Sequence, residues 1–229
     1  MPRKVVSVLI AGGLVVGALA LTRSVVEAHF VPVLCDFMTS GGFVFEDDGG
    51  RDNFGAHGGC KQNGPDAPFW GHVNYVDHNG FTPPTQVLPT VPYHLNSTSI
   101  TGYLCDPAFP NARDVCGFAR TNAGETVRFR VRLVDNGEGS NAPCKDEFGI
   151  RLDNGYLVST RPLADANQGG GNVQYHKPNN SNGGATGGDE LCGGVENPGP
   201  PMQTDRDCPV NPTAAANCPA GGPPPPPGD

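Results

Sequence analysis

Alternation of apolar and polar side chains at every second position is the clearest pattern in this chain. Within residues 125–136, Val127, Phe129, Val131 and Leu133 share one face, and Arg128, Arg130 and Arg132 share the other. Successive side chains of a strand point to opposite sides of a sheet, so the segment predicts a half-buried β-strand. Turn-forming residues follow, and residues 148–153 then alternate again. The two segments predict an antiparallel pair at the centre of a sheet.

Other short segments carry the same signals. Residues 70–78 end at the turn dipeptide Asn79-Gly80 and place Val73 and Tyr75 on one face. Further strands are predicted at 41–45, 87–91 (an edge strand), 95–104, 116–120, 156–159 and 172–176. Residues 46–64 and 106–115 are predicted to be loops, and no helical periodicity occurs between 37 and 178. The pattern predicts an all-β protein, an antiparallel β-sandwich or jelly roll.

The first 28 residues have the pattern of a secretory signal. Arg3 and Lys4 precede an apolar run over residues 5–21, and small residues suited to cleavage follow at 18–20 and 26–28. A retained membrane anchor is the alternative, because 17 apolar residues lie at the lower limit for spanning a bilayer. A lipid anchor at Cys35 is disfavoured by the large Leu34 before it. We therefore expect an exported protein with a cleaved signal, a lead at 29–36 and a β domain at 37–178.

Residues 179–229 differ in composition and are dominated by Asn, Gly and Pro. They contain too little apolar surface to offset the entropy of ordering the chain, so no separate core is predicted. Three cysteines nevertheless lie in this tail. It is therefore predicted to be either disordered or tethered by disulfides.

The net charge excludes one class of partner. The whole chain carries a formal charge of −8, and removal of residues 1–28 takes it to about −10. Such a surface repels nucleic acids and anionic membranes. Neither nucleic-acid binding nor membrane association after signal cleavage is expected.

All eight cysteines lie after the signal segment, and an even number in an exported chain predicts disulfides. Close pairs such as C-x-x-C, typical of metal sites, do not occur. The body holds Cys35, Cys60, Cys105, Cys116 and Cys144, and the tail holds Cys192, Cys208 and Cys218. If all pair within the chain, at least one bridge joins tail to body. The best single pair is Cys105 with Cys116, because these residues flank a loop between two strands that we expect to be neighbours. Further candidate pairs are Cys60 with Cys144, and Cys35 with a cysteine of the tail.

Several short motifs occur together in a characteristic order. They are Gly41-Gly42-Phe43, Asn53-Phe54-Gly55, Gly71 to His78, Asp135-Asn136-Gly137-Glu138 and Gly170-Gly171-Asn172-Val173-Gln174. Over residues 37–178 this combination resembles the post-COAP domain, which accompanies choice-of-anchor A modules in secreted bacterial proteins. The chain departs from that pattern at residues 140–145 and in its cysteine-bearing tail. The resemblance implies an extracellular module and carries no catalytic residues.

Acidic loops offer candidate ligands for calcium, which takes six to eight oxygen ligands. The first candidate group is Asp135, Asn136, Glu138 and Asp146, with Glu147 beside it. Its spacing is not that of a calcium-binding helix–loop–helix, and Asp-Asn-Gly is also a good turn, which is the favoured interpretation. A second group is Glu46, Asp47, Asp48 and Asp52, for which a solvated loop is favoured.

The arginine stripe is a candidate anion site. Arg128, Arg130 and Arg132 can bind a sulfate, a carboxylate or an acidic glycan through paired donors. The favoured alternative is cross-strand pairing with carboxylates on the solvent face of the sheet.

Histidines and aromatic residues provide the remaining candidates. His72, Asp77, His78, His94 and His176 can hold zinc or act as acid and base only if neighbouring strands bring them together, so surface positions are favoured. Sugar rings can stack on exposed aromatics, but core positions are favoured for Trp70, Phe69, Tyr75, Tyr93 and Tyr103.

No nucleophile elbow, HExxH motif or phosphate loop occurs in the sequence. No catalytic residue is therefore predicted. The preferred hypothesis is a secreted, non-catalytic β-sandwich that acts as a structural or ligand-binding module toward an extracellular protein or glycan. The alternatives are a calcium- or glycan-binding module, with calcium as its cofactor, and an extracellular hydrolase or lyase with a site near His72 and Asp77.

Overall fold

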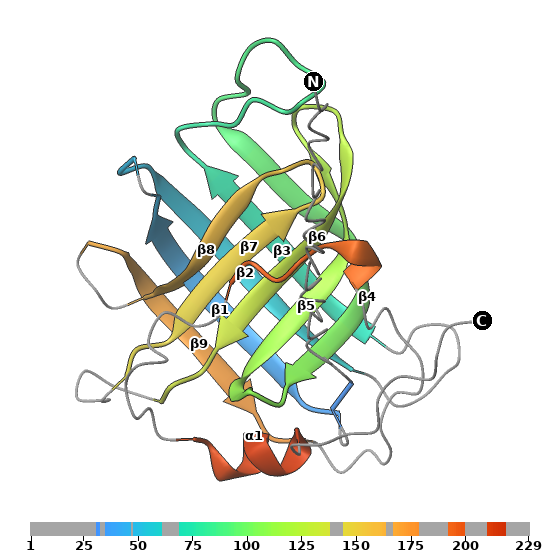
Figure 1. The fold of residues 1–229 in the computed structure, drawn as a ribbon, viewed down its shortest axis with the longest axis vertical. Coiled ribbons are helices and arrows are strands. Elements are labelled where there is room, and N and C mark those ends of the chain that lie inside the picture. The colour runs from blue at the N-terminus through green and yellow to red at the C-terminus, as the bar shows by residue number, and fades with distance from the viewer. Residues whose placement is uncertain are drawn as a thin grey trace, which may run out of the picture.

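A computed structural model describes residues 31–32, 35–46, 48–60, 69–137, 144–163, 167–178, 192–199 and 210–218. Nine antiparallel strands in these ranges form one sheet in the order β8-β7-β6-β5-β4-β3-β2-β1-β9 (Figure 1). The strands are β1 (Phe37–Phe45), β2 (Arg51–Cys60), β3 (Phe69–Asp77), β4 (Tyr93–Asp106), β5 (Phe109–Thr121), β6 (Thr126–Val134), β7 (Glu147–Leu152), β8 (Leu157–Pro162) and β9 (Gly169–His176). The expected all-β antiparallel class is confirmed.

The sheet curls until its first and last strands, β8 and β9, approach each other, so that it is nearly closed. Its two halves then face each other across a common interior. Phe54 on β2 and Phe148 on β7 stack with ring centroids 3.8 Å apart, although four strands separate β2 from β7 in the sheet order. The two facing layers are halves of one continuous sheet.

The interior is lined by the apolar positions of the alternating pattern. On β6, Val127, Phe129, Val131 and Leu133 are all at most 3% exposed, which confirms the face predicted for them. Full burial of a side chain of this size contributes about 1.5–3 kcal/mol. The alternation along β6 thus fixes which face of the strand turns inward.

Two segments predicted to be loops are strands. Glycines suggested a loop over residues 46–64, yet β2 occupies most of it. Gly58 is required there, because a Cβ on it would lie 2.8 Å from Val115 on β5. Residues 106–115 also belong mainly to β5, which follows β4 after a tight turn.

Two further strand predictions need correction. Residues 87–91 form no strand, and only Thr90 makes an isolated bridge to Phe81. The β6–β7 pair is antiparallel as predicted. It lies toward one end of the strand order, however, and β4 is the middle strand.

Among the described residues, two disulfides join the tail to the sheet, in line with the uneven division of cysteines. Cys105 is bonded to Cys218 and Cys116 to Cys192, so the predicted Cys105–Cys116 pair is wrong. The register explains why: Cys116 on β5 lies opposite Gly102 on β4, three residues from Cys105. Three residues correspond to about 10 Å along a strand, beyond the span of a disulfide.

The remaining predicted pairs are also wrong. Cys35 is bonded to Cys60 rather than to a tail cysteine. Cys60 is therefore not the partner of Cys144, which is itself disulfide-bonded. Cys208 lies outside the described residues, as do the predicted signal at 1–28 and the prolines at 223–227. No helix in the described part of the chain is long and apolar enough to cross a bilayer.

The described parts of the tail cover the sheet in two places. The helix α1 (Pro212–Asn217) lies at one end of the curled sheet (Figure 1), where Ala214 is completely buried in the main core. The short 3-10 helix η1 (Cys192–Gly194) and the residues after it cross the outer face of β5 and β6. The described tail segments therefore pack against the nine-stranded sheet and add no strand to it.

Candidate metal centre

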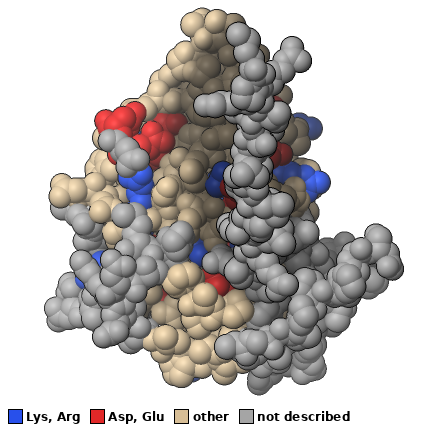
Figure 2. Space-filling view, viewed as in Figure 1, with Lys and Arg blue, Asp and Glu red and all other residues tan. Residues whose placement is uncertain are grey.

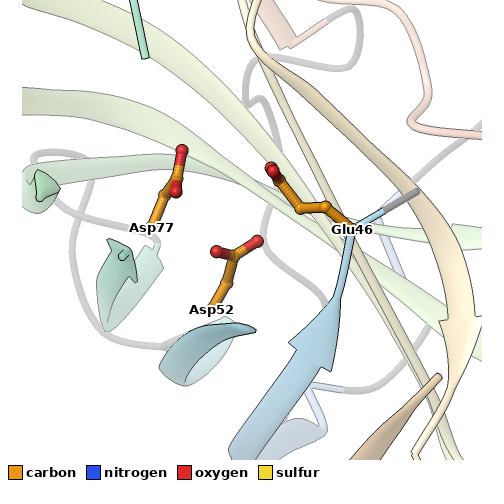
Figure 3. Close-up of side chains that lie close together, drawn as sticks. All are labelled: Glu46, Asp52 and Asp77. Atoms are coloured by element: carbon orange, nitrogen blue, oxygen red, sulfur yellow. The ribbon is translucent and has the colours of Figure 1, made fainter. Parts of the chain in front are cut away.

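Three carboxylates meet at one end of the curled sheet. Glu46 follows the last residue of β1, Asp52 is the second residue of β2, and Asp77 is the last residue of β3. Because these neighbouring strands are antiparallel, the end of β1, the start of β2 and the end of β3 lie side by side. One oxygen from each carboxylate lies within 4.8 Å of the other two. Figure 3 shows the three side chains directed into one shared space.

Asp52 and Asp77 occupy inward positions that apolar residues fill elsewhere on the same strands. The two residues are paired directly across β2 and β3, next to the inward pair Phe54 and Tyr75. Their exposed fractions are 0% and 1%. Like charges placed directly opposite each other on a sheet are destabilising, and burial increases the penalty. The position therefore requires a proton or a cation to offset the repulsion.

Hydrogen bonds reach one oxygen of each carboxylate in the cluster. The Tyr75 hydroxyl donates to Asp52 Oδ2 at 2.6 Å, and the Tyr156 hydroxyl lies 3.1 Å from Glu46 Oε1. Asp77 Oδ1 accepts from the backbone N–H groups of Asn79 and Gly80 at 2.8 and 2.7 Å. Asp52 Oδ1, in contrast, is buried and accepts from no N–H or hydroxyl donor, so it is satisfied only by a proton shared with the Glu46 carboxyl or by a cation.

The electrostatic environment opposes full ionisation of this cluster. Burial is the main cause that raises the pKa of Asp52 to about 8, even though the Tyr75 hydrogen bond lowers it. Burial, followed by the charge of Asp77, also raises the pKa of Glu46. Burial and the neighbouring acids raise the pKa of Tyr75 and Tyr156, so both hydroxyls remain neutral donors.

The surroundings add negative charge. Asp48 is exposed, accepts a hydrogen bond from Gly50 N at 2.8 Å, and helps to raise the pKa of Glu46. Acidic atoms gather where the β1–β2 turn lies (Figure 2). No ion pair involves Glu46, Asp52 or Asp77 within the described ranges.

These features fit a hard divalent cation. Calcium binds oxygen ligands at 2.3–2.6 Å, so ligands on opposite sides of the ion lie about 4.6–5.2 Å apart. The separations within 4.8 Å among the three carboxylates match that span. Glu46 is only half-buried, which leaves its side open to solvent.

No family model, curated protein or solved structure matches this chain. The resemblance of residues 37–178 to the post-COAP domain stays a prediction. The candidate centre therefore rests on geometry and chemistry alone.

The calcium group predicted first has its oxygens in use as hydrogen-bond acceptors. Asp135 accepts from the backbone of Gly137 and Tyr175, at 2.9 and 2.7 Å. Asp146 accepts from the backbone of Asn136 and Val173, at 3.0 and 2.8 Å. These bonds support the alternative turn interpretation, in which the carboxylates hold the loop onto β9. Glu138 lies outside the described residues.

Two residues of the arginine stripe, Arg130 and Arg132, form internal ion pairs, which supports the favoured pairing interpretation over the candidate anion site. Arg132 bonds to Asp114 on β5 and to Asp106 on β4, each at 2.8 Å, and Arg130 pairs with the same Asp114. The favoured interpretation placed these cross-strand pairs on the solvent-exposed face of the sheet, and that exposure is incorrect. Arg130 and Arg132 are buried, and Arg130 donates to the carbonyl of Val195 where the tail crosses. Arg128 lies over the ring of Phe118.

The alternative histidine–aspartate site does not assemble, and the histidines occupy the separate positions that were favoured. His72 is exposed on the outer face of β3, whereas Asp77 points inward. His78 bonds to Asn53, and His176 bonds to Thr39. Of the aromatics proposed for sugar stacking, Phe69, Tyr75, Tyr93 and Tyr103 are buried, and Trp70 is partly exposed.

Part of this candidate centre was already recognisable in the sequence. Glu46 and Asp52 belong to the second acidic group, but Asp77 was assigned elsewhere and β2 was taken for a loop. The inward alternation of Val73 and Tyr75 continues to Asp77, and this parity was the signal that placed the carboxylate inside.

Proposed function

We propose that this protein is an exported, non-catalytic β module that binds one calcium ion through Glu46, Asp52 and Asp77. The observation that carries the proposal is the buried, unpartnered Oδ1 of Asp52, on a carboxylate paired across the strands with that of Asp77. A buried acceptor without a partner costs about 1–3 kcal/mol, and more when it is charged. A divalent cation supplies the missing contact and neutralises both aspartates.

The chain provides only part of the coordination. Three carboxylates account for three to six of the six to eight oxygens that calcium takes, and water entering on the Glu46 side completes the set. The Tyr75 hydroxyl donates to Asp52 Oδ2 and the Tyr156 hydroxyl to Glu46 Oε1. These bonds fix the orientation of the two carboxylates. Binding displaces the proton that Asp52 otherwise holds, because the cation favours the ionised form.

Export is supported by the sequence and by the bridges together. The signal pattern at residues 1–28 precedes a body with three disulfides among its described residues, and disulfides persist in oxidising compartments. The resemblance to the post-COAP domain points to the same extracellular setting. Calcium is preferred to a glycan because most of the proposed stacking aromatics are buried.

A calcium titration followed by thermal unfolding tests the proposal. A ligand at one hundred times its Kd adds about 2.7 kcal/mol, which raises Tm by about 5–10 °C for a domain of this size. Asp52→Asn and Asp77→Asn remove the calcium response. The exposed Glu196→Gln serves as the matched control, because Glu196 pairs with Arg151 on the surface. An unchanged Tm of the wild-type protein at millimolar calcium contradicts the proposal.

A further inference from the structure

Two histidines lie opposite each other on the outer face of the sheet. His57 on β2 is paired in register with His72 on β3. His57 is half-buried and His72 is exposed, and their ring centroids are 6.3 Å apart. Side chains directly opposite on an antiparallel pair have Cβ atoms about 4.5–5.5 Å apart. The register alone thus keeps the two imidazoles together.

The separation suits a shared metal ion. Zinc–imidazole bonds are about 2.0–2.1 Å long, so two imidazoles on one ion have centroids roughly 5 Å apart. The observed 6.3 Å needs only a small rotation of the exposed His72 side chain. Neither strand has to move.

Neighbouring groups orient the His72 ring and favour the neutral form of the His57 ring, which is the form that binds metal. His72 Nδ1 lies 3.1 Å from Ser97 Oγ, which also accepts from the backbone N–H of Val73 at 2.9 Å. When His72 Nδ1–H donates to this hydroxyl, Nε2 is left with a free lone pair. Burial, with a smaller contribution from His72, lowers the pKa of His57, so this ring is neutral at neutral pH.

The third nearby histidine is held away from the pair. His176 on β9 stacks on Phe37 with centroids 4.2 Å apart, and its Nε2 lies 2.9 Å from Thr39 Oγ1. Thr39 is the residue opposite His57 on β1 and thus separates the two rings. Water completes the coordination of an ion held by His57 and His72.

We propose that His57 and His72 form a surface site for a late first-row divalent transition-metal ion, with Cu²⁺ bound more tightly than Zn²⁺. Imidazole nitrogens suit these ions, and the stability order places copper above zinc. The site is separate from the acidic centre in chemistry and in place. His57 and His72 point outward, whereas Asp52 and Asp77 point inward five residues further along the strands, about 17 Å away.

The chain contains its own reporter for this site. Trp70 is the only tryptophan, and its ring centroid lies 5.9 Å from that of His57. A paramagnetic Cu²⁺ ion between the two histidines therefore quenches the Trp70 fluorescence. Calcium, which the imidazoles do not bind, leaves it unchanged.

The test is a Cu²⁺ titration of the purified protein, followed by Trp70 fluorescence and by electron paramagnetic resonance. Saturable quenching with one ion per chain and two coordinated nitrogens is expected. His72→Asn and His57→Asn abolish the saturable phase, and Ser97→Ala weakens the affinity by on the order of tenfold. His78→Asn and His94→Asn are the matched controls and retain it.

Two results overturn the proposal. One is a wild-type protein without saturable quenching, and the other is a His72→Asn variant that titrates like the wild type. Because His72 is exposed, its substitution leaves the fold intact, which a thermal melt verifies. Asp52→Asn retains copper binding, so failure of the calcium site and failure of the histidine site are distinguishable.

Discussion

Asp52 and Asp77 lie directly opposite each other on β2 and β3, with both carboxylates buried in the interior. Antiparallel sheets normally place apolar or oppositely charged partners at such positions. Here the repulsion remains within the folded state and is relieved by a bound proton or by a cation. The stability of the protein should therefore depend on pH and on calcium in a linked manner.

Without divalent cations, the free energy of unfolding should fall as the pH rises from about 4 to about 8. The pKa of Asp52 is about 8 in the folded protein and near 3.8 ordinarily, so the folded state binds more protons in this range. One such group lowers stability by up to about 1.4 kcal/mol per pH unit. The raised pKa of Glu46 acts in the same direction. Urea unfolding in the presence of a chelator, repeated across this pH range, measures the slope.

The Asp52→Asn variant is the control for that slope, because its amide does not titrate. Its stability should depend less on pH than that of the wild type between the same limits. Equal slopes for the two proteins would show that Asp52 is not the group responsible.

The same substitution should stabilise the protein when calcium is absent. At neutral pH the folded wild type must take up a proton on Asp52, whereas asparagine is neutral without one, and its amide can donate to the Asp77 carboxylate. We expect a gain of about 1–3 kcal/mol, comparable to the cost of one unsatisfied buried polar group. Thermal unfolding in chelator should therefore place Asp52→Asn above the wild type. The order should reverse at saturating calcium, and a variant that is less stable in both conditions would argue against the repulsion.

Alternation allowed much of the sheet to be predicted from the sequence. The inward faces of β3 and β6 follow from strict period-two patterns, which depend only on local geometry. The pattern over β2 was hidden by Gly55, Gly58 and Gly59. At Gly58 and Gly59 the missing side chain matters because Val115 and Phe37, from other parts of the chain, approach closely. Such long-range contacts are invisible in a single segment.

The disulfides and the ion pairs show the same limit. Cys218 follows directly after α1, so its pairing with Cys105 depends on the position of α1 at the end of the sheet. No local sequence pattern specifies that position. Likewise, the sequence indicated that Arg130 faces outward with a carboxylate partner. It did not indicate that residues of the tail cover this face and bury the pair.

Removal of Asp114 should be strongly destabilising. Its carboxylate bonds to both Arg130 and Arg132, which are buried where the tail covers the sheet. Asp114→Ala leaves these charges without their main partner, a change that typically costs about 3–5 kcal/mol. Glu196→Ala breaks the exposed pair with Arg151 and should cost at most about 1 kcal/mol. Urea unfolding of both variants checks the difference, and similar losses would contradict the role assigned to burial.

Neighbouring glycines on β1 provide a test of how the sheet closes. A Cβ at Gly42 would lie 2.2 Å from the carbonyl oxygen of Gly170 on β9, whereas at Gly41 the nearest atom is 3.8 Å away. The backbone of β9 cannot yield without losing its ladder with β1. Gly42→Ala should therefore reduce stability, by about 1–3 kcal/mol as in overpacked cores. Gly41→Ala should be neutral or slightly stabilising, because it restricts the unfolded chain without a clash.

Hydrogen exchange locates the effect of these two substitutions. If the close approach of β1 and β9 holds the last strand in place, Gly42→Ala should accelerate exchange at the amides of β9 and leave those of β5 and β6 protected. The sheet order supports this, because β1 is the one strand that pairs with β9, whereas β5 and β6 each pair with a strand on both sides. Uniform acceleration across the sheet would instead mean that closure at β9 and the rest of the fold form one cooperative unit.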